Sequence, residues 1–216
     1  MSSVADICNI GLSLIGADAT ITSITPPDGS VEAGLCARFY PIVRKTALEE
    51  GTFTWSKTRA ALATVTNPST VWAYAYALPA DCLSPKRVLQ QTALVDFLVW
   101  PWGTFLTVDE LNFWTERGTA DFEVEDGVLL TNEPEAVLLY TRDVTDTTKF
   151  TEQFCLYLAM RLGAMLAGPI IKGDEGRKTA TSLLSMAARQ RASAAMDDAN
   201  GSAERGDHLP QHIRSR

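Results

Sequence analysis

Residues 34–55, GLCARFYPIVRKTALEEGTFTW, set the pattern for the rest of the chain. Their apolar residues recur at a spacing close to 3.6, with charged residues on the other side, which predicts a long amphipathic helix. Pro41 lies inside this pattern and removes one backbone hydrogen bond. We therefore expect a kink there, or two abutting helices with Pro41 in the first turn of the second. A tight turn with an exposed aromatic pair, Phe53 and Trp55, is expected to follow.

A shorter helix is predicted before this stretch. It begins at Ser3, whose spacing to Asp6 suits a capping box, and it ends at Gly16. A loop then leads to the long helix, which Asp28 or Ser30 can cap.

Two more helices are predicted after Thr147. The first is apolar on most sides, which indicates a central position. Along it Ala159, Gly163 and Ala167 repeat every four residues, so these small side chains share one face on which another helix backbone could approach closely. Asp174 can cap the second helix, the last long one in the chain.

The middle of the chain changes period and predicts strands. Trp72, Tyr74, Tyr76 and Leu78 alternate with alanines, which places the large side chains on one face. We interpret that face as the aromatic core of a small sheet. A nucleic-acid stacking platform would look similar, but the basic neighbours that it needs are missing. Further strands are predicted at Arg87–Gln91, Leu94–Trp100, Thr104–Asp109, Asn112–Glu116, Ala120–Glu125, Val128–Asn132 and Ala136–Arg142.

Three turn signals bound these strands. Residues 56–64 are expected to form a short helical turn that ends at Asn67-Pro68. Leu-Pro-Ala-Asp-Cys at 78–82 is interpreted as a strand terminator, in which the proline stops the ladder and Asp81 bonds the backbone of the turn. Asp126-Gly127 is the strongest hairpin signal, because a type I′ turn needs positive φ at both central residues.

The predicted fold class is α+β. We expect a four-helix bundle made of the N- and C-terminal helix pairs, with an inserted antiparallel β subdomain. The expected divisions are 1–66 for the N-terminal helices, 67–146 for the β-rich insertion, 147–199 for the C-terminal helices and 200–216 for a flexible tail. The tail has no apolar period and little to bury, so on its own it should be flexible.

Charge is distributed unevenly along the chain. The net charge is −7, and residues 1–150 carry 10 Lys+Arg against 19 Asp+Glu, whereas 151–216 carry 9 against 7. This acidity argues against a dedicated nucleic-acid binder, which would show a basic patch. It would suit a wall past which DNA moves without being gripped, since phosphate contacts dominate non-specific affinity.

The cysteines and the most apolar segment both indicate an intracellular globular protein. Cys8, Cys36, Cys82 and Cys155 are widely spaced in apolar surroundings, so we expect buried thiols. The N-terminus lacks the pattern of a signal peptide. The segment 154–171 is long enough to span a membrane, but Arg161 near its centre favours a buried helix.

No pattern of residues points to catalysis. The two histidines, His208 and His212, lie in the expected tail, and Pro210 between them discourages a shared metal site on a helix. Ser-His-Asp and Cys-His catalysis therefore lack their usual base in the folded part. We expect no enzyme, no cofactor and no metal. A hydrolase that uses two carboxylates stays open as a third hypothesis, because acidic residues abound.

The order of several segments resembles the head-to-tail adaptor proteins of tailed bacteriophages, of the tail tubular protein A type. These segments are DICNIGLSLIGADATITSI (6–24), CARFYPIVRKTALEE (36–50), FTWSKTRAALA (53–63), YAYALPADCL (74–83) and YTRDVTDTTKFTEQFCLYLAMRLGAMLAGPII (140–171). One departure is Ser56-Lys57, where Phe-Ala often follows the tryptophan. The resemblance covers roughly the first ninety residues and resumes near Tyr140.

The resemblance implies a structural virion protein in the tail or neck, assembled in the host cytoplasm. It implies a homo-oligomer, a dodecameric ring, that connects the portal protein to the tail nozzle or next tail protein. DNA would pass through the channel without sequence-specific binding, and no membrane would be involved. C-terminal segments would dock on the portal, for which the candidate residues are Arg205, His208, Leu209, Pro210, Ile213, Arg214 and Arg216. Candidates for contact with the tail or a neighbouring copy are Trp100, Trp102, Phe105 and Trp114.

An alternative function is a peptide- or glycan-binding module. In that case the aromatic residues of the β insertion, which also include Phe113, would line a recognition surface. Large aromatic side chains equally favour protein–protein interfaces, where they act as anchors.

Overall fold

The computed structural model describes residues 3–51, 53–89 and 119–201. These residues form two compact units. The first, called the helical unit, lies within Met1–Trp55 and Val144–Arg216, and the second, called the β unit, lies within Ser56–Asp143. The described residues contain four α-helices and two antiparallel sheets, which confirms the predicted α+β class.

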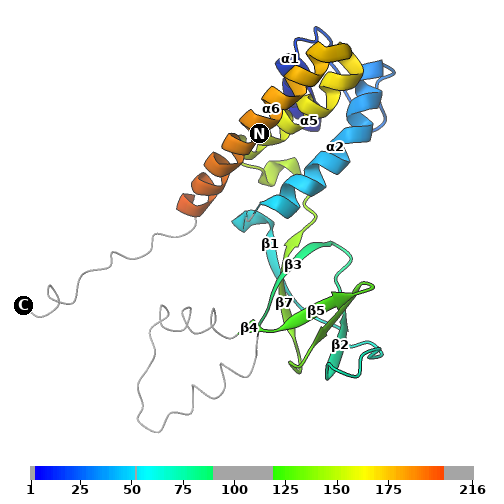
Figure 1. Ribbon diagram of the computed structural model, residues 1–216, viewed down its shortest axis with the longest axis vertical. Coiled ribbons are helices and arrows are strands. Elements are labelled where there is room, and N and C mark those ends of the chain that lie inside the picture. Colours follow the sequence, from blue (N-terminus) through cyan, green and yellow to red (C-terminus); the bar gives the residue numbers. More distant parts are fainter. Residues whose placement is uncertain (1–2, 52, 90–118, 202–216) are drawn as a thin grey trace, which may run out of the picture. The chain divides into compact units, whose positions relative to one another are not determined.

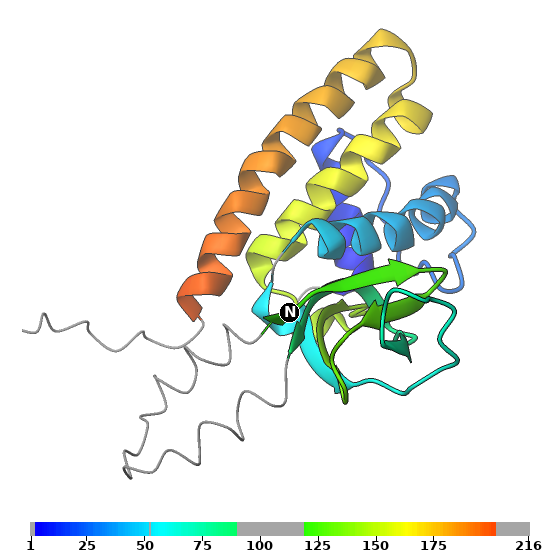
Figure 2. The same cartoon turned by 60° about the horizontal axis from the view of Figure 1, so that its bottom comes forward.

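The helical unit is built around one central helix. Its helices are α1 (Val4–Leu14), α2 (Val31–Glu50), α5 (Glu152–Ile171) and α6 (Gly173–Gly201). Helix α5 contacts each of the other three, and it runs alongside α6 after a sharp turn, as Figures 1 and 2 show. By length and composition α5 could cross a membrane, but 61% of its apolar 18-residue stretch is buried inside the structure. That burial is typical of a core helix.

Two of the predicted helix starts are confirmed, with their caps. Ser3 accepts a hydrogen bond from the backbone N–H of Asp6, and the Asp6 carboxylate accepts one from the Ser3 N–H, which completes the capping box. Ser30 caps α2 by accepting from the backbone N–H of Ala33. Asp28 in turn accepts from the Ser30 hydroxyl at 2.7 Å, and this bond is the main reason that its pKa is far below the usual range. Both predicted candidates therefore shape the start of α2.

One of the two alternatives for Pro41 and one predicted cap are wrong. Helix α2 is one continuous helix with Pro41 inside it, so the alternative of two abutting helices is excluded. Packing of α2 against α5 holds the helix together across the missing N–H. Asp174 is not a cap either, because α6 begins one residue earlier, at Gly173. The chain turns between α5 and α6 through Lys172 and Gly173, both at positive φ (63° and 62°).

The small-residue stripe on α5 is confirmed as a place of close approach. A Cβ on Gly163 would lie 3.0 Å from the carbonyl oxygen of Gly11, and a Cβ on Gly11 would lie 3.1 Å from the carbonyl oxygen of Ala159. Helix α1 thus crosses α5 backbone to backbone. Further along, a Cβ on Gly176 would lie 2.8 Å from the carbonyl oxygen of Ala167, so the first turn of α6 is equally close.

The β unit contains two antiparallel sheets. The four-stranded sheet has the order β1-β7-β3-β4, and the three-stranded sheet has the order β2-β6-β5. The cluster of buried residues between strands consists of Tyr76, Val88, Leu129, Ala136, Leu138 and Tyr140. The strands are β1 (Lys57–Ala61), β2 (Tyr74–Ala77), β3 (Cys82–Leu89), β4 (Thr119–Ala120), β5 (Phe122–Glu125), β6 (Val128–Thr131) and β7 (Val137–Arg142).

Both turn motifs singled out in the sequence act as turns. Asp126 and Gly127 join β5 to β6 with φ of 47° and 76°, as a type I′ hairpin requires. The 78–82 motif ends β2, and the Cys82 N–H donates to the Pro79 carbonyl at 2.9 Å. The Asp81 carboxylate accepts from the Tyr140 hydroxyl at 2.9 Å, rather than from the backbone of the turn as predicted. Burial and this bond raise the pKa of Tyr140 to about 12.

Three expectations for the β unit fail. Residues 57–61 are strand β1 rather than a helical turn, because pairing with β7 outweighs the local helix propensity of the alanines. Tyr76 is buried, but Tyr74 on the same face is exposed, so only part of that face is core. Cys82 is half-buried, whereas the other three cysteines are buried as expected. The predicted strands at 94–100, 104–109 and 112–116 lie outside the described residues.

Candidate functional site

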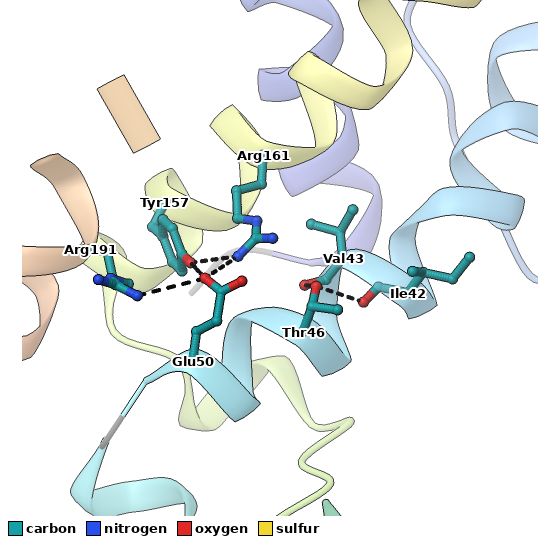
Figure 3. Close-up of polar contacts among 7 residues, drawn as sticks. All are labelled: Ile42, Val43, Thr46, Glu50, Tyr157, Arg161 and Arg191. Carbon is teal, nitrogen blue, oxygen red and sulfur yellow. Dashed lines mark hydrogen bonds and ion pairs between the residues drawn. The ribbon is translucent and has the colours of Figure 1, made fainter. Parts of the chain in front are cut away.

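A group of charged residues from three helices lies where α2 ends. Glu50 of α2, Tyr157 and Arg161 of α5 and Arg191 of α6 converge there, and Figure 3 shows their side chains pointing at one another. We call these four residues the Glu50 cluster. One carboxylate thus joins three helices that are far apart in the sequence.

The Glu50 carboxylate is the acceptor of the cluster. Its Oε2 accepts from Arg161 Nη1 at 2.5 Å and from the Tyr157 hydroxyl at 3.1 Å, and it lies 3.7 Å from Arg191 Nη1. Arg161 also donates to the Tyr157 hydroxyl at 2.9 Å, and its guanidinium lies 5.7 Å from the centre of the Tyr157 ring. The cluster is therefore a closed set of contacts with two positive charges and one negative charge.

The exposure of the cluster is graded from α5 outward. The Arg161 side chain is 20% exposed, whereas Glu50 and Arg191 are 42% and 46% exposed. Burial alone would raise the pKa of Glu50, but the hydrogen bond and charge of Arg161 outweigh it and lower that pKa. A general acid or base needs a pKa near the working pH, and the pKa of Glu50 is lowered instead. The ion pairs of Glu50 with the two arginines therefore favour a structural role, in which the carboxylate connects the helices.

An aromatic cluster follows the end of α2 directly. Phe53 stacks on Trp55 with ring centroids 5.4 Å apart, and both rings pack edge-on against Phe154 of α5, at 4.9 and 5.0 Å. Phe150 contacts Trp55 and Phe154. The aromatic pair predicted to be exposed is therefore inside: Phe53 is fully buried and Trp55 is half-buried.

The same turn is fixed to the far end of α6. The buried carboxylate of Asp198 accepts from the backbone N–H and from the hydroxyl of Thr54, both at 2.6 Å. Asp198 thus caps the short 3₁₀ helix Thr54–Ser56, although it lies about 140 residues away in the sequence. The Glu50 cluster, the aromatic cluster and the Thr54–Asp198 pair together hold α2, α5 and α6 at one place.

The helical unit has two grooves of note, and one of them borders the Glu50 cluster. One of about 240 Å³ is lined by Glu50, Tyr157, Arg161 and Arg191, together with apolar atoms of α6. A larger one of about 510 Å³ lies between the start of α1, the loop at 22–25 and α2, where Tyr40 and Arg44 line it. The Tyr40 hydroxyl is enclosed without a hydrogen-bond partner. Within the described residues, no group of three or more His, Cys, Asp or Glu is placed to hold a metal ion.

The site residues predicted from the sequence lie outside the described residues. This holds for the four candidates for tail or neighbour contact, between 100 and 114, and for the seven candidates for portal docking, between 205 and 216. Those assignments stay predictions.

The contacts that the structure does bring together were missed at the sequence level. Arg161 carried the one usable signal, because an arginine inside an apolar helix needs a partner. Its partner Glu50 lies 111 residues away, and no local pattern connects the two. Asp198 gave no signal at all, since it looks like any acidic residue near a helix end.

Comparisons with known proteins add no identification. No known protein-family model matches the chain, and a search of curated proteins found no similar sequence.

Proposed function

We propose that the protein is a structural virion protein that forms the ring between a phage portal and the tail and lines the DNA exit channel. In this proposal the described residues act as a scaffold. The helical unit carries the C-terminal segment that docks on the portal, and the β unit carries the segment that faces the tail or a neighbouring copy. The chain has no catalytic task in this role.

The observation that carries the proposal is the placement of the segments on which the resemblance rests. Residues 36–50 form most of α2, and 53–63 form the aromatic turn and β1. Residues 74–83 form β2 and the turn into β3, and 140–171 run from the end of β7 through α5. The segments thus coincide with the contacts that hold each unit together, as expected if they reflect a shared fold.

A finer point of architecture belongs to the same proposal. The central position of α5, with α1, α2 and α6 around it, favours a four-helix bundle made of the two terminal helix pairs. The β unit is inserted between α2 and α5. A rigid helical body is well suited to repeat around a ring, because each copy must present the same surfaces to both neighbours.

The charge of the chain supports the channel role. A net charge of −7 gives a protein wall that repels packaged DNA, since binding to DNA rests on contacts between phosphates and basic side chains. Binding of a duplex to the assembled ring should therefore be weak at physiological ionic strength.

The test is electron microscopy of the purified protein with the portal protein encoded near it. The proposal expects an added annular layer on the wide end of the portal ring. A chain without residues 202–216 keeps α6 complete to Gly201, so it should keep its melting temperature and lose most portal binding. A chain with the same fifteen residues in shuffled order is the matched control and should also bind poorly. A full-length protein that leaves the portal undecorated would refute the proposal.

A further inference from the structure

Two of the four described strands at sheet edges in the β unit carry charges, and these charges are of opposite sign. Strand β1 is at the edge of the four-stranded sheet, next to β7 only, and β5 is at the edge of the three-stranded sheet, next to β6 only. An edge strand presents a row of backbone N–H and C=O groups that can pair with another strand. Among the described strands neither edge is covered by a further one.

Along both edge strands, charged residues of one sign alternate with uncharged residues. Lys57 and Arg59 are exposed on one face of β1, while Thr58 and Ala60 between them are half-buried. On β5, Glu123 and Glu125 are exposed on one face of the strand. Each pair is two residues apart, so the two spacings along the strands are equal, at about 7 Å.

The side chains on the acidic edge are not wholly polar. Val124 between the two glutamates is 40% exposed, which is high for a valine in a sheet. Glu123 also accepts a hydrogen bond from the Trp72 indole N–H at 3.1 Å, so its carboxylate is held in place by a residue of the loop before β2. This edge thus combines an ordered negative charge with apolar area that a further strand could cover.

We propose that β1 of one copy pairs with β5 of the next copy and so forms the contact between neighbours. In an antiparallel ladder that sets Arg59 opposite Glu123, Lys57 falls opposite Glu125, so both charge pairs form at once. The inference rests on the proposed ring, for which it supplies the joint between subunits. The partner is a second copy of this chain.

Repulsion between like charges explains why the two paired edges must be different ones. Two β1 edges would place basic side chains opposite one another, and two β5 edges would do the same with glutamates, so both self-pairings are disfavoured. Among the pairings of these two edges, only the unlike one is favoured. Such a contact uses a different surface on each side, which builds a head-to-tail ring when the rotation closes.

The test uses charge reversal in full-length protein. The variant K57E/R59E has two acidic edges, and E123K/E125K has two basic edges. Each should need at least a tenfold higher concentration than the wild type to form rings, measured by sedimentation and by electron microscopy on the portal. The chain with all four substitutions should assemble at the wild-type concentration. An equal mixture of the two double variants should also assemble, with the two kinds alternating.

The controls separate this inference from the proposed function. K178E/R189E reverses two exposed charges on α6 and should assemble normally. Melting curves exclude unfolding of any variant. If the wild type forms rings and the double variants form them equally well, the edge pairing is wrong while the adaptor role stands. If double variants fail and neither the mixture nor the fourfold variant restores assembly, the edges bind something other than each other, which also overturns the inference. If the wild type forms no ring with the portal, the proposed function itself fails.

Discussion

Replacing Gly163 by alanine adds one methyl group where α1 crosses α5. Alanine is the better helix former by about 1 kcal/mol, so an open site would gain stability. Here the new Cβ would lie 3.0 Å from the Gly11 carbonyl oxygen and 3.3 Å from a methyl of Leu183. The first neighbour is backbone and cannot rotate away, so α1 must move by a few tenths of an ångström. Overpacking of this kind costs about 1–3 kcal/mol, which leaves a net loss of about 1 kcal/mol.

Gly34 is the matched control, because it lies on an exposed part of α2 and an added Cβ there meets nothing within 4 Å. Gly34→Ala should stabilise the protein by about 0.5–1 kcal/mol. In thermal melts followed by circular dichroism, Gly163→Ala should therefore unfold roughly 3–8 °C below Gly34→Ala, at about 2–4 °C for each kcal/mol. Equal gains in melting temperature for the two variants would refute the close crossing of α1 and α5.

Two further perturbations test the contacts at the end of α2. Asp198→Ala removes the acceptor of two hydrogen bonds from Thr54 and should cost about 2–3 kcal/mol, as measured by urea unfolding. Asp198→Asn should cost far less, because the amide can still accept from the Thr54 N–H and can donate to its hydroxyl; an equal loss in both variants would contradict this geometry. The pKa of Glu50 is lower in the folded protein than its ordinary value of 4.5, which applies to the unfolded chain. The ion pairs of Glu50 therefore stabilise the fold fully at a pH above 4.5, and this contribution is lost as the pH falls through the pKa of the folded state. The free energies of unfolding of wild type and Glu50→Gln should therefore differ by about 1 kcal/mol or less at pH 7 for so exposed a group, and their melting temperatures should converge in acid; a difference in melting temperature that stays constant down to pH 2 would exclude Glu50 as the titrating group.

Features that depend on neighbouring residues were predictable from the sequence. The caps at Ser3 and Ser30 and the hairpin at Asp126-Gly127 rest on contacts within a few residues, where local chemistry decides. The stripe of small residues on α5 was also readable, because its period matches the helix. In these cases the local preference and the fold agree.

Features that depend on distant partners were not predictable. Strand β1 has the alanine-rich composition of a helix, and only its register with β7, about 80 residues away, makes it a strand. The burial of Phe53 follows from the position of Phe154, and the convergence on Glu50 follows from how three helices pack. A single sequence carries no record of such pairings. The same holds for the opposite charges on β1 and β5, which gain meaning only once both are known to be edges.

The insertion of the β unit between α2 and α5 has a consequence for synthesis on the ribosome. The central helix α5 emerges about 100 residues after α2 is finished, which is roughly 5–20 s at ordinary rates of translation. During that interval the apolar faces of α1 and α2 have no α5 to cover them. Strand β7 is made just before α5, and its pairing with β1 sets Thr141 beside Lys57, so the two ends of the insertion meet. The nascent β unit thereby closes the long loop in advance, and α5 reaches α2 as though the two helices were joined by a short connection.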